Sequence, residues 1–177
     1  MLDLESILLS DDVVSSINDN LDMILAFIPE LRFSINFDHK HPHHHLDVWK
    51  HTLLALSLSK KDFDVRLALL LHDIGKPFSY TEGEVRHFNG HPKVSAEMSK
   101  TILKRLGYED NYIDYICYLI SHHDYPITLN QIQENIDLTL KLYEVQRCDA
   151  LAHNPEKLDK RKDYLRKTKE KILGLRK

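Results

Sequence analysis

The sequence Leu-Leu-Leu-His-Asp-Ile-Gly-Lys-Pro at residues 69–77 limits most strongly what this chain can fold into. It places the imidazole of His72 beside the carboxylate of Asp73 at the end of an apolar segment. Ionised groups in such surroundings rarely lack a partner, because removing them from water is costly. A divalent cation would satisfy both side chains, so we predict a metal site. Further candidate ligands are His51 upstream and His91, His122, His123 and Asp149 downstream.

The composition favours one helical domain. A chain of 177 residues is long enough for one well-buried core and short for two. Five glycines and six prolines supply few of the tight turns that an all-β fold needs. The two cysteines, Cys117 and Cys148, lack the spacing of a zinc ribbon, so we expect free thiols in a reducing compartment. We therefore predict an all-α fold.

Charge and hydropathy narrow the choice of partners. The net charge of −3 is not the strongly positive field of a dedicated nucleic-acid binder, which favours a small substrate. No basic-then-apolar leader is visible, and no apolar run approaches the ~20 residues needed to cross a bilayer. We expect a cytoplasmic protein without membrane contact. The sequence does not specify the oligomeric state.

Apolar positions at three- and four-residue spacing predict most of the helices. They cover residues 13–28, 46–58, 62–74, 92–106, 111–122 and 138–152. Gly75 is predicted to end the third helix, and residues 76–90 to form an irregular excursion with a short hairpin or a mobile flap. The connection over 124–136 could contain another short helix. We expect a single bundle of seven or eight helices, with N-terminal helices in 1–36, a motif-bearing core in 37–154 and a charged C-terminal helix in 155–177.

The candidate ligands suit one or two divalent metal ions. Imidazole and carboxylate groups together suit zinc, iron, manganese, cobalt or nickel, and magnesium is not distinguished from these. The lack of thiolate ligands argues against a purely structural zinc site. Most candidates fall at predicted helix ends, where side chains from several helices can converge. Six or seven donors exceed what one tetrahedral ion needs, so two ions bridged by Asp73 are predicted. The sequence does not assign donors to each ion, and it does not decide between His122 and His123.

These residues resemble the HD superfamily of metal-dependent phosphohydrolases, whose pattern is a first histidine, a His-Asp doublet and a later aspartate. His51, the His72-Asp73 doublet and Asp149 carry that pattern here. His91 and the His122-His123 pair look like the additional histidines of members that hold two or more metals. In detail the chain is similar to the HD domain of bacterial CCA-adding tRNA nucleotidyltransferases. The stretches that carry this similarity are 43–54, 67–77, 87–98 and 149–154.

Two departures refine the resemblance. The nucleotidyltransferase head with its paired acids has no counterpart in this sequence, so we do not expect nucleotide addition by this chain alone. The Gly-Tyr-Pro signature of cyclic-dinucleotide phosphodiesterases is replaced by Asp124-Tyr125-Pro126. That replacement disfavours a cyclic dinucleotide as the substrate.

The resemblance implies a phosphohydrolase that cleaves a phosphomonoester or phosphodiester of a nucleotide-type substrate by attack of metal-bound hydroxide. A bound cation lowers the pKa of its water from 15.7 to about 7 and draws charge from a phosphoryl oxygen. No protein nucleophile is needed, and none stands out. Asp73 and Lys76 are the predicted catalytic residues, since Lys76 could neutralise a phosphate. The alternative for Lys76 is a lysine that stabilises a helix C-terminus.

Several neighbouring residues have two interpretations. His44, His45 and Asp47 either contact substrate or belong to a solvated loop, and Arg147 either binds phosphate or faces solvent. Arg86, His87 and Phe88 form either a pocket wall or a surface flap. The mixed charges of 157–177 are typical of a solvated helix face, with RNA contact as the alternative.

A rival function belongs to another class. The chain could be a non-catalytic RNA-binding or regulatory HD module of tRNA or nucleotide metabolism, which keeps the metal fold without hydrolysis. An HD-type oxygenase with a di-iron frame is a third alternative, which the resemblance to the phosphohydrolase branch disfavours.

Overall fold

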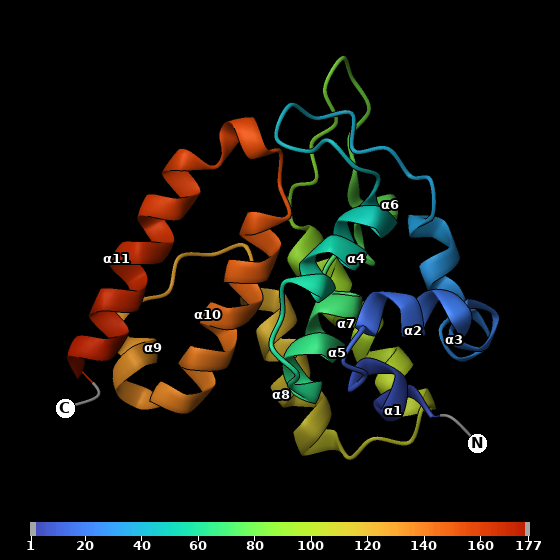
Figure 1. Cartoon of the computed structure of the whole chain (residues 1–177), viewed down its shortest axis with the longest axis horizontal. Coiled ribbons are helices and arrows are strands. Elements are labelled where there is room, and N and C mark those ends of the chain that lie inside the picture. Colours follow the sequence, from blue (N-terminus) through green and yellow to red (C-terminus); the bar gives the residue numbers. More distant parts are fainter. Residues whose placement is uncertain (1–2, 176–177) are drawn as a thin grey trace.

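The computed structural model describes residues 3–175 as a bundle of helices (Figure 1). Over these residues there is no β-strand, and two isolated bridges join Asp38 to Asp47 and Thr81 to His87. The prediction of an all-α fold is therefore confirmed. The α-helices are α1 (Leu4–Leu8), α2 (Val13–Asp19), α3 (Leu21–Phe27), α4 (Val48–Ser57), α5 (Phe63–Leu71), α6 (Lys76–Ser79), α7 (His91–Arg105), α8 (Asp110–His122), α9 (Leu129–Glu134), α10 (Ile136–Leu151) and α11 (Asp159–Leu175). Two 3₁₀ helices, η1 (Pro29–Ser34) and η2 (Pro155–Lys157), complete the regular structure of this part of the chain.

The described residues form eleven α-helices rather than seven or eight, because several helices are short. The stretch predicted as one helix over 13–28 is divided into α2 and α3 at Asn20, whose backbone has left the helical region (φ −116°, ψ 20°). A reciprocal capping box between Asp3 and Ser6 begins α1. A second box, between Thr128 and Gln131, begins α9 in the connection where a short helix was an option.

Helix α5 is buried from Val65 to its end at Leu71 and occupies the centre of the bundle. Its residues Leu67, Leu69, Leu70 and Leu71 are at most 1% exposed. Its neighbours cover it on several sides, because α1, α4, α8 and α10 all pack against α5. Figure 1 shows α1–α3 at one edge of the molecule and α11 at the opposite edge, where it packs on α10.

The turn after α5 differs from the prediction. Helix α5 ends at Leu71, and the chain turns through residues 72–75 before α6 begins. Gly75 is not a left-handed helix cap, because its backbone is right-handed (φ −81°, ψ −14°). It is needed for space: a Cβ there would lie 2.6 Å from the backbone nitrogen of Ser95, whose Oγ accepts a hydrogen bond from the Gly75 N–H (3.0 Å). This close approach fixes the turn that carries His72 and Asp73 against α7.

The excursion over 76–90 begins with α6 and continues as a loop that is tied to residues 37–47. The backbone N–H of Arg86 donates to the Lys40 carbonyl (3.1 Å), and its guanidinium donates to the Asp38 carbonyl (2.6 Å). The same guanidinium lies 4.8 Å from the ring centroids of both Phe37 and Tyr80. The two loops therefore form one wall, which stands next to the site described below.

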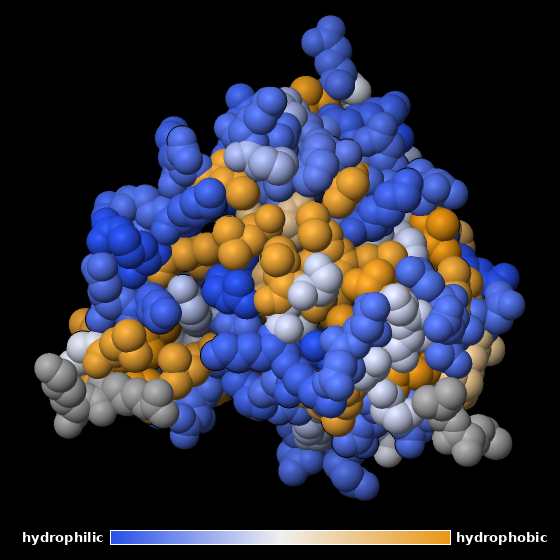
Figure 2. All heavy atoms as spheres, viewed as in Figure 1, coloured by the Kyte–Doolittle hydropathy of each residue, from blue (hydrophilic) through white to orange (hydrophobic). Residues whose placement is uncertain are grey.

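Hydrophilic residues cover most of the face seen in Figure 2, and apolar side chains gather in the middle of it. Among the helices of residues 3–175, none is long and apolar enough to cross a membrane.

Candidate metal centre

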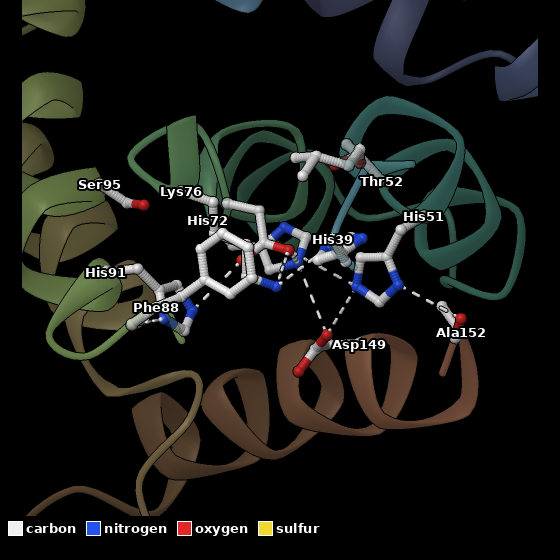
Figure 3. A network of polar contacts seen from close by, with 12 residues as sticks. His39, His51, Thr52, His72, Lys76, Phe88, His91, Ser95, Asp149 and Ala152 are labelled. Atoms are coloured by element: carbon white, nitrogen blue, oxygen red, sulfur yellow. Dashed lines mark hydrogen bonds and ion pairs between the residues drawn. The ribbon is translucent and has the colours of Figure 1, made fainter. Parts of the chain in front are cut away.

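Side chains from four helices and from the turn after α5 converge at one buried place (Figure 3). Asp149 projects from the last turns of α10, and His51 lies in the first half of α4. His91 is the first residue of α7, and His123 is the residue that follows α8. All six residues, His51, His72, Asp73, His91, His123 and Asp149, are at most 7% exposed.

The His51 group consists of His51, His72, Asp73 and Asp149. The Nε2 atom of His51 lies 2.9 Å from Oδ1 of Asp149 and 3.7 Å from Oδ2 of Asp73. The Nε2 atom of His72 lies 3.3 Å from the same Asp73 oxygen and 3.6 Å from the same Asp149 oxygen. Each of these two nitrogens thus lies within 3.7 Å of an oxygen of both carboxylates.

The His91 group consists of Asp73, His91 and His123. Oδ1 of Asp73 lies 3.3 Å from Nε2 of His91 and 3.8 Å from Nε2 of His123. The two imidazole Nε2 atoms are 3.1 Å apart. Asp73 therefore directs one oxygen to each group and joins the two.

Backbone carbonyls fix which nitrogen of each ring faces the centre. The Nδ1 atoms of His51, His72, His91 and His123 lie within 2.6–3.2 Å of the carbonyl oxygens of Ala152, Leu69, Phe88 and Ile120. A carbonyl oxygen only accepts, so each Nδ1 carries a hydrogen and Nε2 is the nitrogen that faces the centre, with a lone pair for a metal whenever the ring is neutral. Such a hydrogen bond from the distal nitrogen is typical of metal-binding histidines.

The donor set fits a divalent cation, because it leaves buried polar atoms without partners. Nε2 of His72 and Oδ1 of Asp73 are both buried and make no hydrogen bond. Unpartnered buried polar atoms cost free energy unless another group, such as an ion, satisfies them. Lone pairs of His91 and His123 that face each other at 3.1 Å also need a proton or a cation between them.

The electrostatics of the centre keep both carboxylates ionised. Burial alone would raise the pKa of Asp73, but the charges of His72 and Lys76 hold it well below its usual value. The pKa of Asp149 is also well below its usual value: burial opposes this shift, and His153 and His51 produce it. Burial lowers the pKa of His123 to about 3, so its ring stays neutral and available as a ligand.

Lys76 belongs to this centre. Its Nζ donates to Oδ2 of Asp73 (2.7 Å) and to Nε2 of His39 (3.2 Å), and its side chain is buried. It is the first residue of α6 rather than a solvated residue at a helix C-terminus, so the macrodipole interpretation does not apply. Its ammonium lies 5.6 Å from the ring centroid of Phe88.

The structure separates the two adjacent histidines that the sequence left open. The ring of His122 stacks on Tyr118, with 4.1 Å between centroids, and its Nδ1 contacts the Tyr118 carbonyl at 2.9 Å. Among the described residues it belongs to none of the clusters that could hold a metal, whereas His123 does. The structure thus brings together six of the seven predicted ligands and leaves His122 outside.

Sequence reasoning missed His153. It forms a third cluster with His51 and Asp149, and its Nδ1 lies 2.9 Å from the Asp149 carbonyl. The signal was available, because His153 follows Asp149 by four residues and so lies on the same side of the helix end. His39 and His44, which stack at 3.7 Å between centroids, come from the histidine-rich loop beside it.

A recess of about 220 Å³ opens onto the centre; we call it the first recess. Its walls include Arg86, His87 and Phe88, which favours the pocket-wall interpretation of these residues. The other lining residues are His41, His43, His44, Lys76, Asn89, His91, His123, Asp124, Asp149, His153 and Arg161.

Three other candidates lie outside the first recess. Arg147 pairs with Glu144 (2.8 Å) and donates to the Leu58 carbonyl, so it is a structural residue. Asp47 accepts from the Lys50 N–H and caps α4. His45 is exposed, as the solvated-loop interpretation predicts.

A family model described as HD domain matches residues 43–167, and the chain belongs to this family. Among curated proteins, the chain is 29% identical over 113 residues to a CC-adding tRNA nucleotidyltransferase of Thermus thermophilus. The aligned region covers 59% of this chain and 26% of that protein. It is 42% identical over 71 residues to an A-adding tRNA nucleotidyltransferase of Deinococcus radiodurans, and the aligned region covers 36% of this chain and 16% of that protein. It is 34% identical over 84 residues to a multifunctional CCA protein of Shewanella denitrificans, and the aligned region covers 46% of this chain and 20% of that protein. The resemblance stated from the sequence is thereby confirmed, and the matches span about a quarter or less of these relatives' length.

Proposed function

We propose that this chain is a metal-dependent phosphohydrolase that cleaves a phosphomonoester or phosphodiester of a nucleotide-type substrate. The observation that carries the proposal is the buried convergence of four Nε2 lone pairs and two carboxylates, with His72 Nε2 and Asp73 Oδ1 left without partners. The HD domain family includes metal-dependent phosphohydrolases, which agrees with this proposal.

The proposal assigns roles to the residues of the centre. One cation would be held by His51, His72, Asp149 and Oδ2 of Asp73, and a second by His91, His123 and Oδ1 of Asp73. Bound divalent cations lower the pKa of water and stabilise charge on a phosphoryl oxygen. Imidazole-rich donor sets of this kind suit manganese, iron, cobalt, nickel or zinc better than magnesium.

Lys76 has two tasks in the proposal. It orients Asp73 through the hydrogen bond to Oδ2, and its ammonium stands in the wall of the first recess, where a phosphate would lie. A positive charge in a buried site stabilises the negative charge that accumulates on a phosphoryl group during transfer.

The test is the substitution Asp73→Ala, with Asp137→Asn as a matched control at an exposed carboxylate of α10. Asp73 serves both groups, so we expect the variant to lose its bound metal and to lose phosphatase activity by at least about 100-fold. Removing a residue that only hydrogen-bonds to a metal ligand costs about 10- to 100-fold, and removing a ligand itself should cost more. Far-ultraviolet circular dichroism should stay unchanged. Metal content would be measured in the purified protein before and after manganese loading. Metal-dependent turnover that persists in Asp73→Ala contradicts the proposal.

The rival, a non-catalytic RNA-binding or regulatory module, predicts a different outcome in the same preparation. Phosphomonoesters, cyclic phosphates and dinucleoside polyphosphates would be supplied with and without manganese. Hydrolysis of at least one class supports the phosphohydrolase. Metal-loaded protein that is inert on all of them but retards tRNA in a gel supports the rival, for which the names of the curated relatives give a reason.

A further inference from the structure

A second recess, of about 250 Å³, lies beside the first and differs from it in chemistry. Both are lined by His123, Asp124, Asp149 and Arg161, so they adjoin at the candidate metal centre. The remaining walls of the second recess are Tyr125, Pro126, Gln146, Ala150, Lys160 and Tyr164. Four of these six remaining residues are aromatic or apolar, whereas cationic side chains and histidines predominate in the first recess.

Gln146 holds the two aromatic walls in place. Its Nε2 donates to the carbonyl of Tyr125 (2.7 Å), and its Oε1 accepts from the hydroxyl of Tyr164 (3.0 Å). The Tyr164 hydroxyl in turn accepts from the N–H of Ile127 (3.0 Å). The Gln146 amide and the Tyr164 hydroxyl are thus used within the protein, and the ring of Tyr125 is 53% exposed.

The two recesses together match the polarity of a nucleotide. A nucleotide has a phosphate at one end and a flat, mostly apolar ring at the other. Lys76, Arg86 and Arg161 supply positive charge to the first recess, and Arg161 stands where the two recesses meet. Each recess alone is smaller than the roughly 300–1,000 Å³ of typical small-molecule sites, and the two combined fall within that range.

We propose that the second recess binds the base of a mononucleotide whose phosphate lies in the first recess, with Tyr125 as the stacking platform. This inference rests on the proposed function, because it specifies which phosphate esters the centre accepts. The carboxylate of Asp124, at the junction, is placed to accept hydrogen bonds from sugar hydroxyls.

The first arm of the test measures base binding without any reaction. Adenosine and cytidine carry a base but no phosphate, and their binding to the metal-loaded protein would be followed by saturation-transfer NMR. Loss of one base–aromatic stacking contact lowers affinity about tenfold or more. We expect Tyr125→Ala to raise the dissociation constant of at least one nucleoside by about that factor, Tyr125→Phe to restore it, and Phe33→Ala to leave it unchanged. Phe33 is a similarly exposed aromatic residue (58%, against 53% for Tyr125) that lines neither recess.

The second arm compares hydrolysis of adenosine and cytidine 5′-monophosphates with that of ribose 5-phosphate, which lacks a base. We expect Tyr125→Ala to raise KM about tenfold for a nucleotide and to raise it much less for ribose 5-phosphate, which offers no base to stack, whereas Phe33→Ala should change neither. If Tyr125→Ala changes KM equally for both kinds of substrate, or for neither, the proposed base recess is wrong, whereas the proposed phosphohydrolase function is unaffected. Tyr125-dependent nucleoside binding without hydrolysis of any phosphate ester supports the recess and overturns the proposed function instead.

Discussion

Asp73 is the residue on which the candidate centre depends most, because its two oxygens face different sets of nitrogen atoms. Oδ2 faces His51 and His72, and Oδ1 faces His91 and His123. Lys76 contacts Oδ2 as well, at 2.7 Å. The rings around it each contribute to one group only, so substitutions of single histidines should separate the two groups.

The adjacent residues His122 and His123 provide a matched pair for that experiment. His123→Ala removes one of the three donors of the His91 group, so we expect one fewer bound metal ion per chain after loading with manganese. His122→Ala should leave the metal content unchanged, because its ring stacks on Tyr118 outside the cluster. Elemental analysis of both variants after manganese loading is the measurement. A loss of metal in His122→Ala equal to that in His123→Ala would contradict the assignment.

At this scale the sequence indicates which residues belong to the cluster better than it indicates how the rings point. The motif order places His51, the His72-Asp73 doublet and Asp149 together without reference to coordinates. The choice between His122 and His123 depends on the direction of each side chain at the end of α8, which consecutive residues do not share. His39 reaches Lys76 from an irregular loop, and nothing in the local sequence predicts the path of that loop.

At the scale of elements, the contact between the turn after α5 and helix α7 positions the doublet. Gly75→Ala would place a methyl group 2.6 Å from the Ser95 nitrogen, so the turn or the helix must move. We expect a loss of about 1–3 kcal/mol in the free energy of unfolding, as for other overpacked sites, together with weaker metal binding. Urea denaturation followed by the fluorescence of Trp49, the only tryptophan, measures the first effect.

Gly174 in α11 is the control for that substitution, because a Cβ there meets nothing within 4 Å. Gly174→Ala should raise stability, by at most about 1 kcal/mol, since alanine is the better helix former. A Gly75→Ala protein as stable as the wild type would show that the close approach to Ser95 is not needed.

The long helices were predictable because their ends carry local signals. Residues 92–106, 111–122 and 138–152 were predicted, and the structure has α7, α8 and α10 with ends that differ by at most two residues. Pro92 and Gly107 mark the ends of α7 in the sequence itself. The division at Asn20 and the turn at 72–75 were not predictable in this way, because packing against other helices sets them and the periodicity of apolar residues continues through both.

At the scale of the whole molecule, the buried histidines make the stability of the metal-free protein depend on pH. Burial, with the charge of Lys76, lowers the pKa of His39 to about 2, and burial lowers the pKa of His153 to about 3. In the unfolded chain both would titrate near the ordinary value of 6.5. Below pH 6.5 the unfolded state therefore binds more protons than the folded state. The contribution of each histidine to stability is complete above pH 6.5 and is lost as the pH falls below it.

We expect the free energy of unfolding to fall between about pH 7 and pH 5, by up to about 1.4 kcal/mol per pH unit for each such histidine. Urea midpoints of the metal-stripped protein across this range are the measurement. His39→Gln should reduce the slope, and His45→Gln, at an exposed position, should not. A stability that is constant over this range would show that these histidines are not held neutral by burial.

The candidate ligands stand on helix ends and on a turn that is pressed against α7, whereas the walls of both recesses come largely from the loops at 37–47, 80–90 and 124–127 and from α11. Loops accept substitutions and insertions that a packed bundle does not. Selection can therefore change which phosphate ester fits above the cluster while the cluster itself is inherited intact. Similarity in the motif residues alone is then a poor guide to the substrate. Related proteins with different substrates should differ in the side chains around Arg86, Tyr125 and Arg161.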